Sequence, residues 1–514
     1  MFQGLVGRLL PLRGAVLRTA TVWLACLSIF SMTGVVFGLP SLYPSLYGLG
    51  FWARLCGAEA AVCQAHSRSI SSTVDEDGKC CEAQLLRVGL TSSITFFMAD
   101  AAAGPWGEYV DRVGPRQCFA TASFASACGF TLLGFLLLPG SSLSLGRDVA
   151  TTAAFAILGL VGPGIFNGGY VGCLAIVGES PAHVSAFTAY SAACFDGSAL
   201  VLALLHLLGV RFGVGLVFAM ISWAAVILVL RFLFLHCLDE HRAELLVVRG
   251  KDGVPASAQP LPPATESSLL LGPSTGTVGA SAQLTDPTAA THTATTTTTT
   301  LPTDEEGSEH MPSLRSTLLH RANLAVVGLM VSLNLINAFY LQTQADQMGL
   351  LFSPSTAANL STFLEFGFPI LGFLASIAAV THVFERNHDR ELLCWAWPAG
   401  LGIAFCLVQM IPYVAAQYVA AMLFGPMRTL QWACYFHALA VAPRYPQHLA
   451  GRVLGYNNVV IALLSDTLPY ALSAVVASGD SEPSASVEAL RYALVRVALL
   501  VPMLASSGAL AFTL

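Results

Sequence analysis

Charged residues lie deep inside several long apolar stretches of this sequence, and five of them are candidates for function: Asp100, Asp196, Glu365, Arg428 and Asp466. A charge at the depth of a lipid bilayer is costly, so residues of this kind are paired with one another or serve a function. Carboxyl and guanidinium groups in such places can bind ionic solutes or exchange protons. We therefore take these five as candidate functional residues.

Arg428 and Glu365 each lie near the middle of an apolar stretch in the second half of the chain. One interpretation is a structural ion pair between them. The other is that Arg428 binds the carboxylate of a substrate while Glu365 orients it, because an arginine offers a planar pair of donors that fits a carboxylate. Gly425 and Pro426 precede Arg428 and are expected to loosen the helix there.

Four uncharged polar residues are further candidates for substrate binding. Asn167 and Tyr170 lie in a glycine-rich stretch, and Asn334 and Asn337 lie in the second half of the chain. A helix broken at the glycines would offer backbone groups to the amino and carboxylate ends of a zwitterion. Close helix packing explains the glycines, and hydrogen bonds between helices explain the asparagines, equally simply.

Four of the thirteen cysteines lie together in one polar segment, at Cys56, Cys63, Cys80 and Cys81. Their confinement predicts at least one disulfide if the segment faces an oxidising compartment. A zinc site is the alternative, but the segment has no CxxC pattern and no paired histidines. We expect no metal and no cofactor.

The composition decides the class of protein. Of the 514 residues, 55% are hydrophobic and 11% are charged, whereas soluble proteins carry about 25% charged residues. This excludes a soluble enzyme, and the sequence has no metalloprotease, serine-hydrolase or P-loop pattern. The net charge of -6 gives no reason to expect a nucleic-acid partner.

Apolar blocks of about twenty residues, the length that crosses a bilayer, recur along the chain. Six lie near 20–48, 84–104, 117–138, 150–177, 184–208 and 212–237, and six more near 321–345, 354–381, 391–411, 413–442, 450–476 and 489–512. Between them, 238–320 is rich in Ser, Thr, Pro and Ala, which predicts a disordered linker. The pattern predicts an all-α membrane protein with twelve transmembrane helices in two pseudo-symmetric six-helix bundles, 20–237 and 321–514.

The basic residues predict the orientation of the chain in the membrane. If residues 1–19 lie in the cytoplasm, fifteen Lys and Arg residues fall on the inner side and seven on the outer side. Both termini and the linker are then cytoplasmic, and the loop near 49–83 with its four cysteines lies outside. The charge argument and the disulfide argument are independent and agree.

The loop between the second and third blocks carries the most specific pattern. From Gly107 it reads Gly-Glu-Tyr-Val-Asp-Arg-Val-Gly-Pro-Arg, and the residues of interest are Gly107, Asp111, Arg112, Gly114 and Arg116. A glycine lets two helices approach closely, an aspartate suits the positive end of a neighbouring helix, and the arginines can pair with acids. Together these residues predict a conformational latch on the cytoplasmic side. Asp100 lies eleven residues before Asp111, on nearly the same helix face, so it either supports this latch or touches substrate.

This loop resembles the signature loop of the major facilitator superfamily, with a departure at Pro115, where many members have a basic residue. Shorter segments resemble the sodium-independent, system-L type neutral amino acid transporters of that superfamily and the related apicomplexan amino acid transporters. They are Phe37 to Leu42, Cys80 to Gln84, Tyr190 to Ser198 and Pro446 to Gly455. The resemblance implies facilitated amino acid transport and leaves Asp466 without a role.

We therefore expect a monomeric, multi-pass transporter in the plasma membrane or an internal membrane, whose partners are an amino acid and the lipid bilayer. Two alternatives stay open. One is a proton-coupled carrier of another small solute, because Asp100, Asp196 and Glu365 could titrate. The other is a membrane receptor or scaffold on the same fold.

Overall fold

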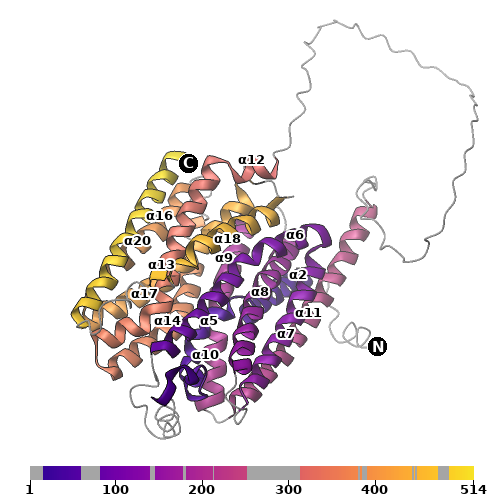
Figure 1. Cartoon of the computed structure of the whole chain (residues 1–514). Helices are drawn as coiled ribbons and strands as arrows, with labels where there is room; N and C mark the ends of the chain where they lie inside the picture. The colour runs from indigo at the N-terminus through magenta and orange to yellow at the C-terminus, as the bar shows by residue number, and fades with distance from the viewer. Residues whose placement is uncertain are drawn as a thin grey trace, which may run out of the picture. The chain divides into compact units, whose positions relative to one another are not determined.

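The computed structural model of the chain describes residues 15–59, 82–138, 145–177, 181–211, 214–251, 313–379, 383–384, 391–442, 445, 449–469, 471–472 and 485–514. In this part of the chain the regular structure is helical (Figure 1). The first half contains α2 (Ala15–Met32), η1 (Val35–Leu42), α3 (Tyr43–Gly48), η2 (Ala53–Glu59), α5 (Glu82–Ala101), α6 (Ala103–Val113), α7 (Pro115–Leu136), α8 (Leu145–Val177), α9 (Pro181–Gly197), α10 (Leu200–His206), η3 (Leu207–Arg211) and α11 (Leu216–Lys251). The second half contains α12 (Leu314–Leu318), α13 (Arg321–Leu351), α14 (Pro354–Ala379), α16 (Glu391–Gln409), α17 (Val414–Val441), α18 (Ala450–Ser465) and α20 (Ala485–Thr513).

Nine spans within the described residues are long and apolar enough to cross a bilayer. The other three blocks expected from the sequence correspond to α5 with α6, to α17 and to α18. α18 has 16 residues before it ends beside Asp466, and α17 carries Arg428 together with several buried polar groups. These three are less apolar because they turn polar side chains toward protein instead of lipid.

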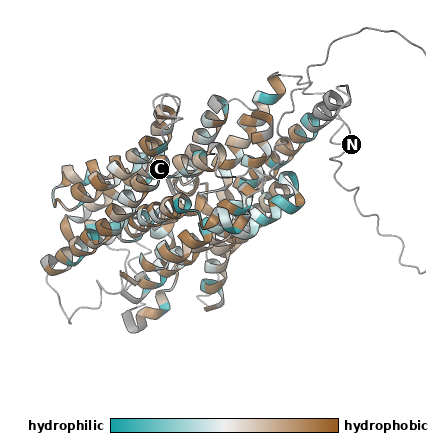
Figure 2. Ribbon diagram, turned by 90° about the horizontal axis from the view of Figure 1, so that it is seen from above, coloured by the Kyte–Doolittle hydropathy of each residue, from teal (hydrophilic) through white to brown (hydrophobic). Residues whose placement is uncertain are grey.

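Much of the helical ribbon is coloured brown in Figure 2, for hydrophobic residues, and many large apolar side chains are exposed. Trp23, Phe218 and Trp397 expose 62%, 63% and 55% of their surface. Such side chains are stable against hydrocarbon, and helices are the structures that satisfy their own backbone groups there. The chain is therefore an integral, multi-pass membrane protein.

The helices pack into two halves that meet along two seams. In the first half α8 packs against α7, α5 and α2, and in the second half α17 packs against α14 and α16 while α13 packs against α20. One seam joins α5 and α6 to α18, and the other joins α9 to α14 and α17. The helices at these seams carry Asp100, Asp196 and Arg428, and Asp466 directly follows α18.

Of the two explanations for the glycines of the fourth span, the structure supports close packing and not a broken helix. α8 is continuous from Leu145 to Val177 despite Pro163, and its glycines are packing positions. A Cβ on Gly159 would overlap the carbonyl oxygen of Thr95, and a Cβ on Gly168 would come within 2.8 Å of the Phe119 side chain. α17 is likewise continuous through Pro426.

The helices break instead in the first, fifth and eleventh spans. α2 ends at Met32 and continues as the 3-10 helix η1, α9 gives way to α10 after Gly197, and α18 ends at Ser465. The first two breaks touch, because a Cβ on Gly38 would overlap the carbonyl oxygen of Ala199. The irregular backbone thus lies inside the protein, where it is tolerated at membrane depth.

The linker is shorter than the sequence predicted. α11 continues to Lys251, beyond the expected end near 237, and α13 is preceded by the short helix α12. The centre of the linker and residues 1–14 lie outside the described residues. Cys63, Cys80 and Cys81 also lie outside the described residues. Cys56 is buried and disulfide-bonded. Which of the four cysteines pair with one another stays a prediction.

Candidate functional site

An ion pair joins the two halves at the middle of the bundle. Nε of Arg428 in α17 donates a hydrogen bond of 2.9 Å to Oδ1 of Asp196 in α9. Arg428 lies fourteen residues after the first residue of α17 and thirteen before its last, and both partners are 1% exposed. Removing either partner would leave an uncompensated charge in the membrane interior.

The face of an aromatic ring covers the same guanidinium. Cζ of Arg428 lies 4.0 Å from the centroid of the Phe37 ring, within the range of a cation–π contact. The Phe37 ring also lies 5.1 Å from Phe96 and 5.8 Å from Phe195 between centroids. Because Phe37 belongs to η1, the break in the first span is what positions this ring.

The ion pair leaves one donor and one acceptor unused. Among the described residues, Nη2 of Arg428 and Oδ2 of Asp196 are buried and have no hydrogen-bond partner. A buried polar atom left in this state costs about 1–3 kcal/mol, and more when it is charged. The pair can therefore accept an ionic ligand that satisfies these atoms.

The expected ion pair between Arg428 and Glu365 is wrong. Within the described part of the chain, Arg428 pairs with Asp196 from the other half, and Glu365 in α14 takes part in no ion pair. Glu365 is half-buried. Hydropathy placed both residues near mid-depth but carried no information about which helix each one faces.

A second polar cluster joins the same two halves next to the ion pair. Nδ2 of Asn334 in α13 lies 3.1 Å from Oδ2 of Asp100 and 3.1 Å from Oδ1 of Asp466. It also lies 2.8 Å from Oγ of Ser465. The two carboxyl groups interact electrostatically with each other and with Arg428. Asp100 thus belongs to the buried cluster and not to the latch.

The other predicted polar residues are buried but lie apart from these contacts. Nδ2 of Asn337 donates to Oε1 of Gln431 at 2.8 Å, a bond between two helices of the second half. The Tyr170 hydroxyl lies 2.9 Å from the Thr188 hydroxyl. Nδ2 of Asn167 is buried without a partner among the described residues. Helix packing accounts for Asn337 and Tyr170 without a ligand.

A run of aromatic rings in contact, drawn from both halves, was not anticipated from the sequence. From Phe195 it passes to Trp432 at 6.0 Å and to Phe166 at 5.7 Å between centroids. Phe166 then meets Phe436 at 4.6 Å and Tyr170 at 5.4 Å. These rings fill the space between the halves beside the ion pair. Aromatic residues in apolar blocks resemble ordinary lipid-facing residues, so composition gave no signal for them.

The predicted latch residues lie at one end of the bundle, which we call the Gly114 end because α6 and α7 meet there. A Cβ on Gly107 would overlap the carbonyl oxygen of Gly451, so α6 and α18 touch backbone to backbone. Asp111 lies against Gly451, the second residue of α18, and its Oδ2 is 3.6 Å from Nε of Arg452. The expected close approach and helix-terminus contact are therefore both present in the geometry.

The latch arginines have different partners. Arg116 forms a bidentate pair with Asp239 of α11, at 2.6 Å and 2.7 Å. Arg112 contacts Glu108 one turn earlier on its own helix and points outward. Gly114 has φ of +101°, a conformation that favours glycine. Arg116 and Gly114 thus shape the turn between α6 and α7. Within the described part of the chain, Asp111 is the charged residue of the loop that pairs with the second half.

Asp111→Asn is expected to reduce solute uptake by about 2- to 10-fold, which corresponds to the 0.5–1.5 kcal/mol that a charge contributes at a helix terminus together with an ion pair. The protein should still insert in the membrane. The sequence also predicts a latch role for Arg112, but its partner Glu108 lies on its own helix, so we now expect Arg112→Ala to transport normally and to serve as the matched control. Uptake normalised to membrane-inserted protein checks this, and equal losses in both variants would contradict it.

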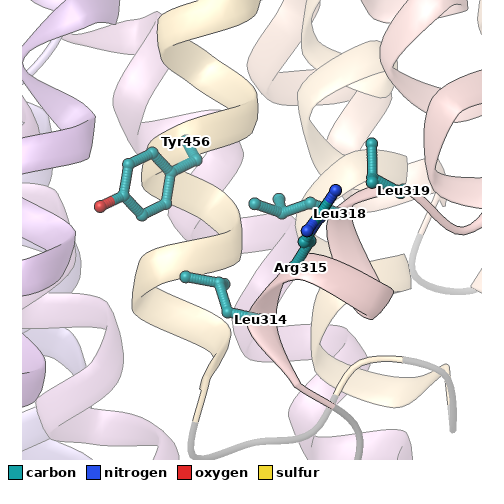
Figure 3. Close-up of a pocket in the computed structure, with 5 residues that line it drawn as sticks. All are labelled: Leu314, Arg315, Leu318, Leu319 and Tyr456. Atoms are coloured by element: carbon teal, nitrogen blue, oxygen red, sulfur yellow. The ribbon is translucent and has the colours of Figure 1, made fainter.

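One surface cavity lies near the same end, away from the charged clusters. It has a volume of about 270 Å³ and is lined by Leu314, Arg315, Leu318, Leu319 and Tyr456 (Figure 3). Four of these residues come from α12 and the turn after it, and Tyr456 comes from α18. The cavity is open, nearly all apolar and holds none of the buried charges, so it is not the candidate site.

Several solved transporters share this fold along their whole length. The chain is similar to the human organic anion transporter MFSD10, with 13% identity, a TM-score of 0.57 and coverage of 95% of this chain and 99% of that one. It is similar to a bacterial homologue of the iron transporter ferroportin in an outward-facing state, with 9% identity, a TM-score of 0.55 and coverage of 96% and 98%. It is also similar to the proton:xylose symporter XylE of the major facilitator superfamily, with 10% identity, a TM-score of 0.53 and coverage of 95% and 96%.

No protein-family model and no curated protein sequence matches the chain. The structural similarity therefore establishes the fold and not the solute. The chain has the major facilitator fold, as the twelve apolar blocks and the loop at Gly107 predicted.

Proposed function

We propose that the protein is a membrane transporter that binds the carboxylate of a small solute at Arg428, between the two halves. The observation that carries this proposal is a guanidinium buried at mid-depth whose Nη2 has no partner among the described residues. Nε is already held by Asp196 and one face by Phe37. These contacts fix the direction of the Nη2 donors, which suits recognition of a planar anion.

The charges around Arg428 favour a zwitterion, and hence an amino acid, over a simple anion. Three carboxyl groups interact electrostatically with one guanidinium: Asp196 by direct contact, and Asp100 and Asp466 from the neighbouring cluster. A solute that carries an ammonium group as well as a carboxylate would complement both signs at once. The resemblance of the sequence to amino acid transporters supports the same substrate class, whereas an organic anion would meet the guanidinium but also the excess of carboxyl groups.

Contacts on both sides of the ion pair support alternating access. Toward the Gly114 end the halves meet at Gly107 and Gly451. Toward the opposite end Oγ of Ser93 in α5 donates to Oε1 of Gln342 in α13 at 3.2 Å. The site is enclosed between these contacts, as expected for a carrier that opens to one side at a time.

The orientation predicted by the basic residues completes the proposal. The Gly114 end faces the cytoplasm together with the linker and both termini, and the segment of Cys56 faces outward. The plasma membrane is the proposed location, because it gives that segment an oxidising environment.

A tracer-uptake panel in proteoliposomes tests the substrate class. It should compare labelled amino acids, their amides and esters, a monocarboxylate and a sugar, each with and without a pH gradient. We expect competition by amino acids with a free carboxylate and none by their amides. Uptake of the sugar alone would overturn the carboxylate site, and uptake of nothing in the panel would favour a receptor or scaffold.

A further inference from the structure

The cluster of Asp100, Asp466 and Asn334 holds more acidic groups than its surroundings can neutralise. Both carboxyl groups lie 3.1 Å from the single Nδ2 of Asn334, so the two groups share one donor. Asp100 and Asp466 are 5% and 2% exposed. Two negative charges this close in a dry site repel strongly, and such pairs hold one proton between them.

The groups that face this pair are known from each helix packed around it. α13 contributes Asn334, the end of α18 contributes Ser465, and α17 contributes Arg428 and Tyr435. Of these only Arg428 is a cation, and its Nε is bound to Asp196 of α9. With every carboxyl group ionised, three negative charges would face one positive charge. A bound proton reduces this imbalance.

The geometry of hydrogen bonding agrees with a shared proton. A hydrogen bond between two carboxyl groups requires that one of them is protonated. Oδ2 of Asp466 is buried and receives no N–H or O–H from the described residues. Asn334 donates to one oxygen of each carboxyl group, and so leaves the other oxygens to the proton.

We propose that Asp100 and Asp466 form a proton-binding site that is complete only when the two halves are closed at the seam of α5 and α6 with α18. Asp100 belongs to the first half, and Asp466 and Asn334 belong to the second. When the seam opens, the carboxyl groups separate, water reaches them, and the proton is released. A proton bound only by the closed seam stabilises that state, so a rise in pH favours opening.

This inference rests on one part of the proposed function, namely that the two halves of the carrier move apart during transport. It involves no solute and no ligand role for Arg428. Hydrogen exchange of the full-length protein in lipid nanodiscs, without solute, tests it at pH 6, 7 and 8 after correction for the intrinsic exchange rate. The readout is the exchange of amides in α6 and α18, with α13 and α20 as an internal reference.

In the unchanged protein we expect seam opening to increase with pH, by up to about tenfold per pH unit for one linked proton. Asp100→Asn and Asp466→Asn should abolish this slope, since an amide cannot release a proton. Asp148→Asn is the matched control: it removes another buried aspartate, which faces Arg54 at 3.5 Å, and should keep the slope.

A flat pH profile in the unchanged protein overturns the proposal, and it does so even if the variants fail to fold. A slope that persists in folded Asp100→Asn also overturns it. Replacing choline with sodium at fixed pH separates a metal cation from a proton: an opening that responds to sodium and not to pH would assign the cluster to the cation. Failure of the uptake panel leaves this test unaffected, because the test contains no solute.

Discussion

Arg428→Lys is expected to lower solute uptake by about 10- to 100-fold, the effect of losing a charge-assisted hydrogen bond of roughly 1.5–3 kcal/mol. Lysine keeps the charge and the ion pair with Asp196, but it cannot hold Asp196 with one nitrogen and present a second in a fixed direction. The loss should appear in the apparent affinity for the solute. Uptake kinetics, normalised to inserted protein, measure it.

Two variants serve as controls for this prediction. Arg496→Lys changes another buried arginine, whose Nη1 donates to the carbonyl oxygen of Gln409 at 2.8 Å, and should leave affinity unchanged. Glu365→Gln should have little effect, because Glu365 is not the partner of Arg428. If Arg428→Lys is inserted and transports with normal affinity, Arg428 is not the carboxylate ligand.

Asp196→Asn separates a site residue from a purely structural one. It would leave the guanidinium without its anion, and removing one partner of a buried pair costs about 3–5 kcal/mol. We therefore expect low yield from Asp196→Asn and normal yield from Arg428→Lys. Low yield from both would favour a structural ion pair.

Gly107→Ala is expected to reduce uptake by about 5- to 150-fold while the protein is still inserted. The added Cβ would overlap the carbonyl oxygen of Gly451 and lie 2.9 Å from its carbonyl carbon. Both atoms belong to backbone, so no side chain can move aside, and overpacking of this kind costs about 1–3 kcal/mol. The cost falls on the state in which α6 and α18 touch, and the carrier should be held open at the Gly114 end.

Gly89→Ala is the matched control for Gly107→Ala. Gly89 lies in α5 of the same span, and a Cβ there meets no atom within 4 Å. It should express and transport as the unchanged protein does. Normal uptake by Gly107→Ala would show that the contact with Gly451 plays no part in the transport cycle.

The depth of each important residue along its helix could be predicted from the sequence. Hydropathy marks where a span begins and ends, so Asp100, Asp196, Arg428 and Asp466 were expected at membrane depth. The loop from Gly107 to Arg116 could also be recognised from the sequence, because its pattern is defined by residue types and their spacing along the chain. The polar second, tenth and eleventh spans fell short of the apolarity of the others because they line the seams between halves.

Which residues meet was decided only by the tertiary structure. Arg428 pairs with Asp196, which is 232 positions away, and not with Glu365. Hydropathy could not predict this partner, because it assigns the same depth to residues on many different helices. The breaks fall at η1, after Gly197 and at Asp466, and not at the glycines of α8, because packing neighbours determine whether a glycine bends a helix or lets another helix approach. Hydrophobicity and residue spacing fix position along a helix axis, whereas the direction a side chain faces and the partner it meets depend on contacts between segments far apart in the chain.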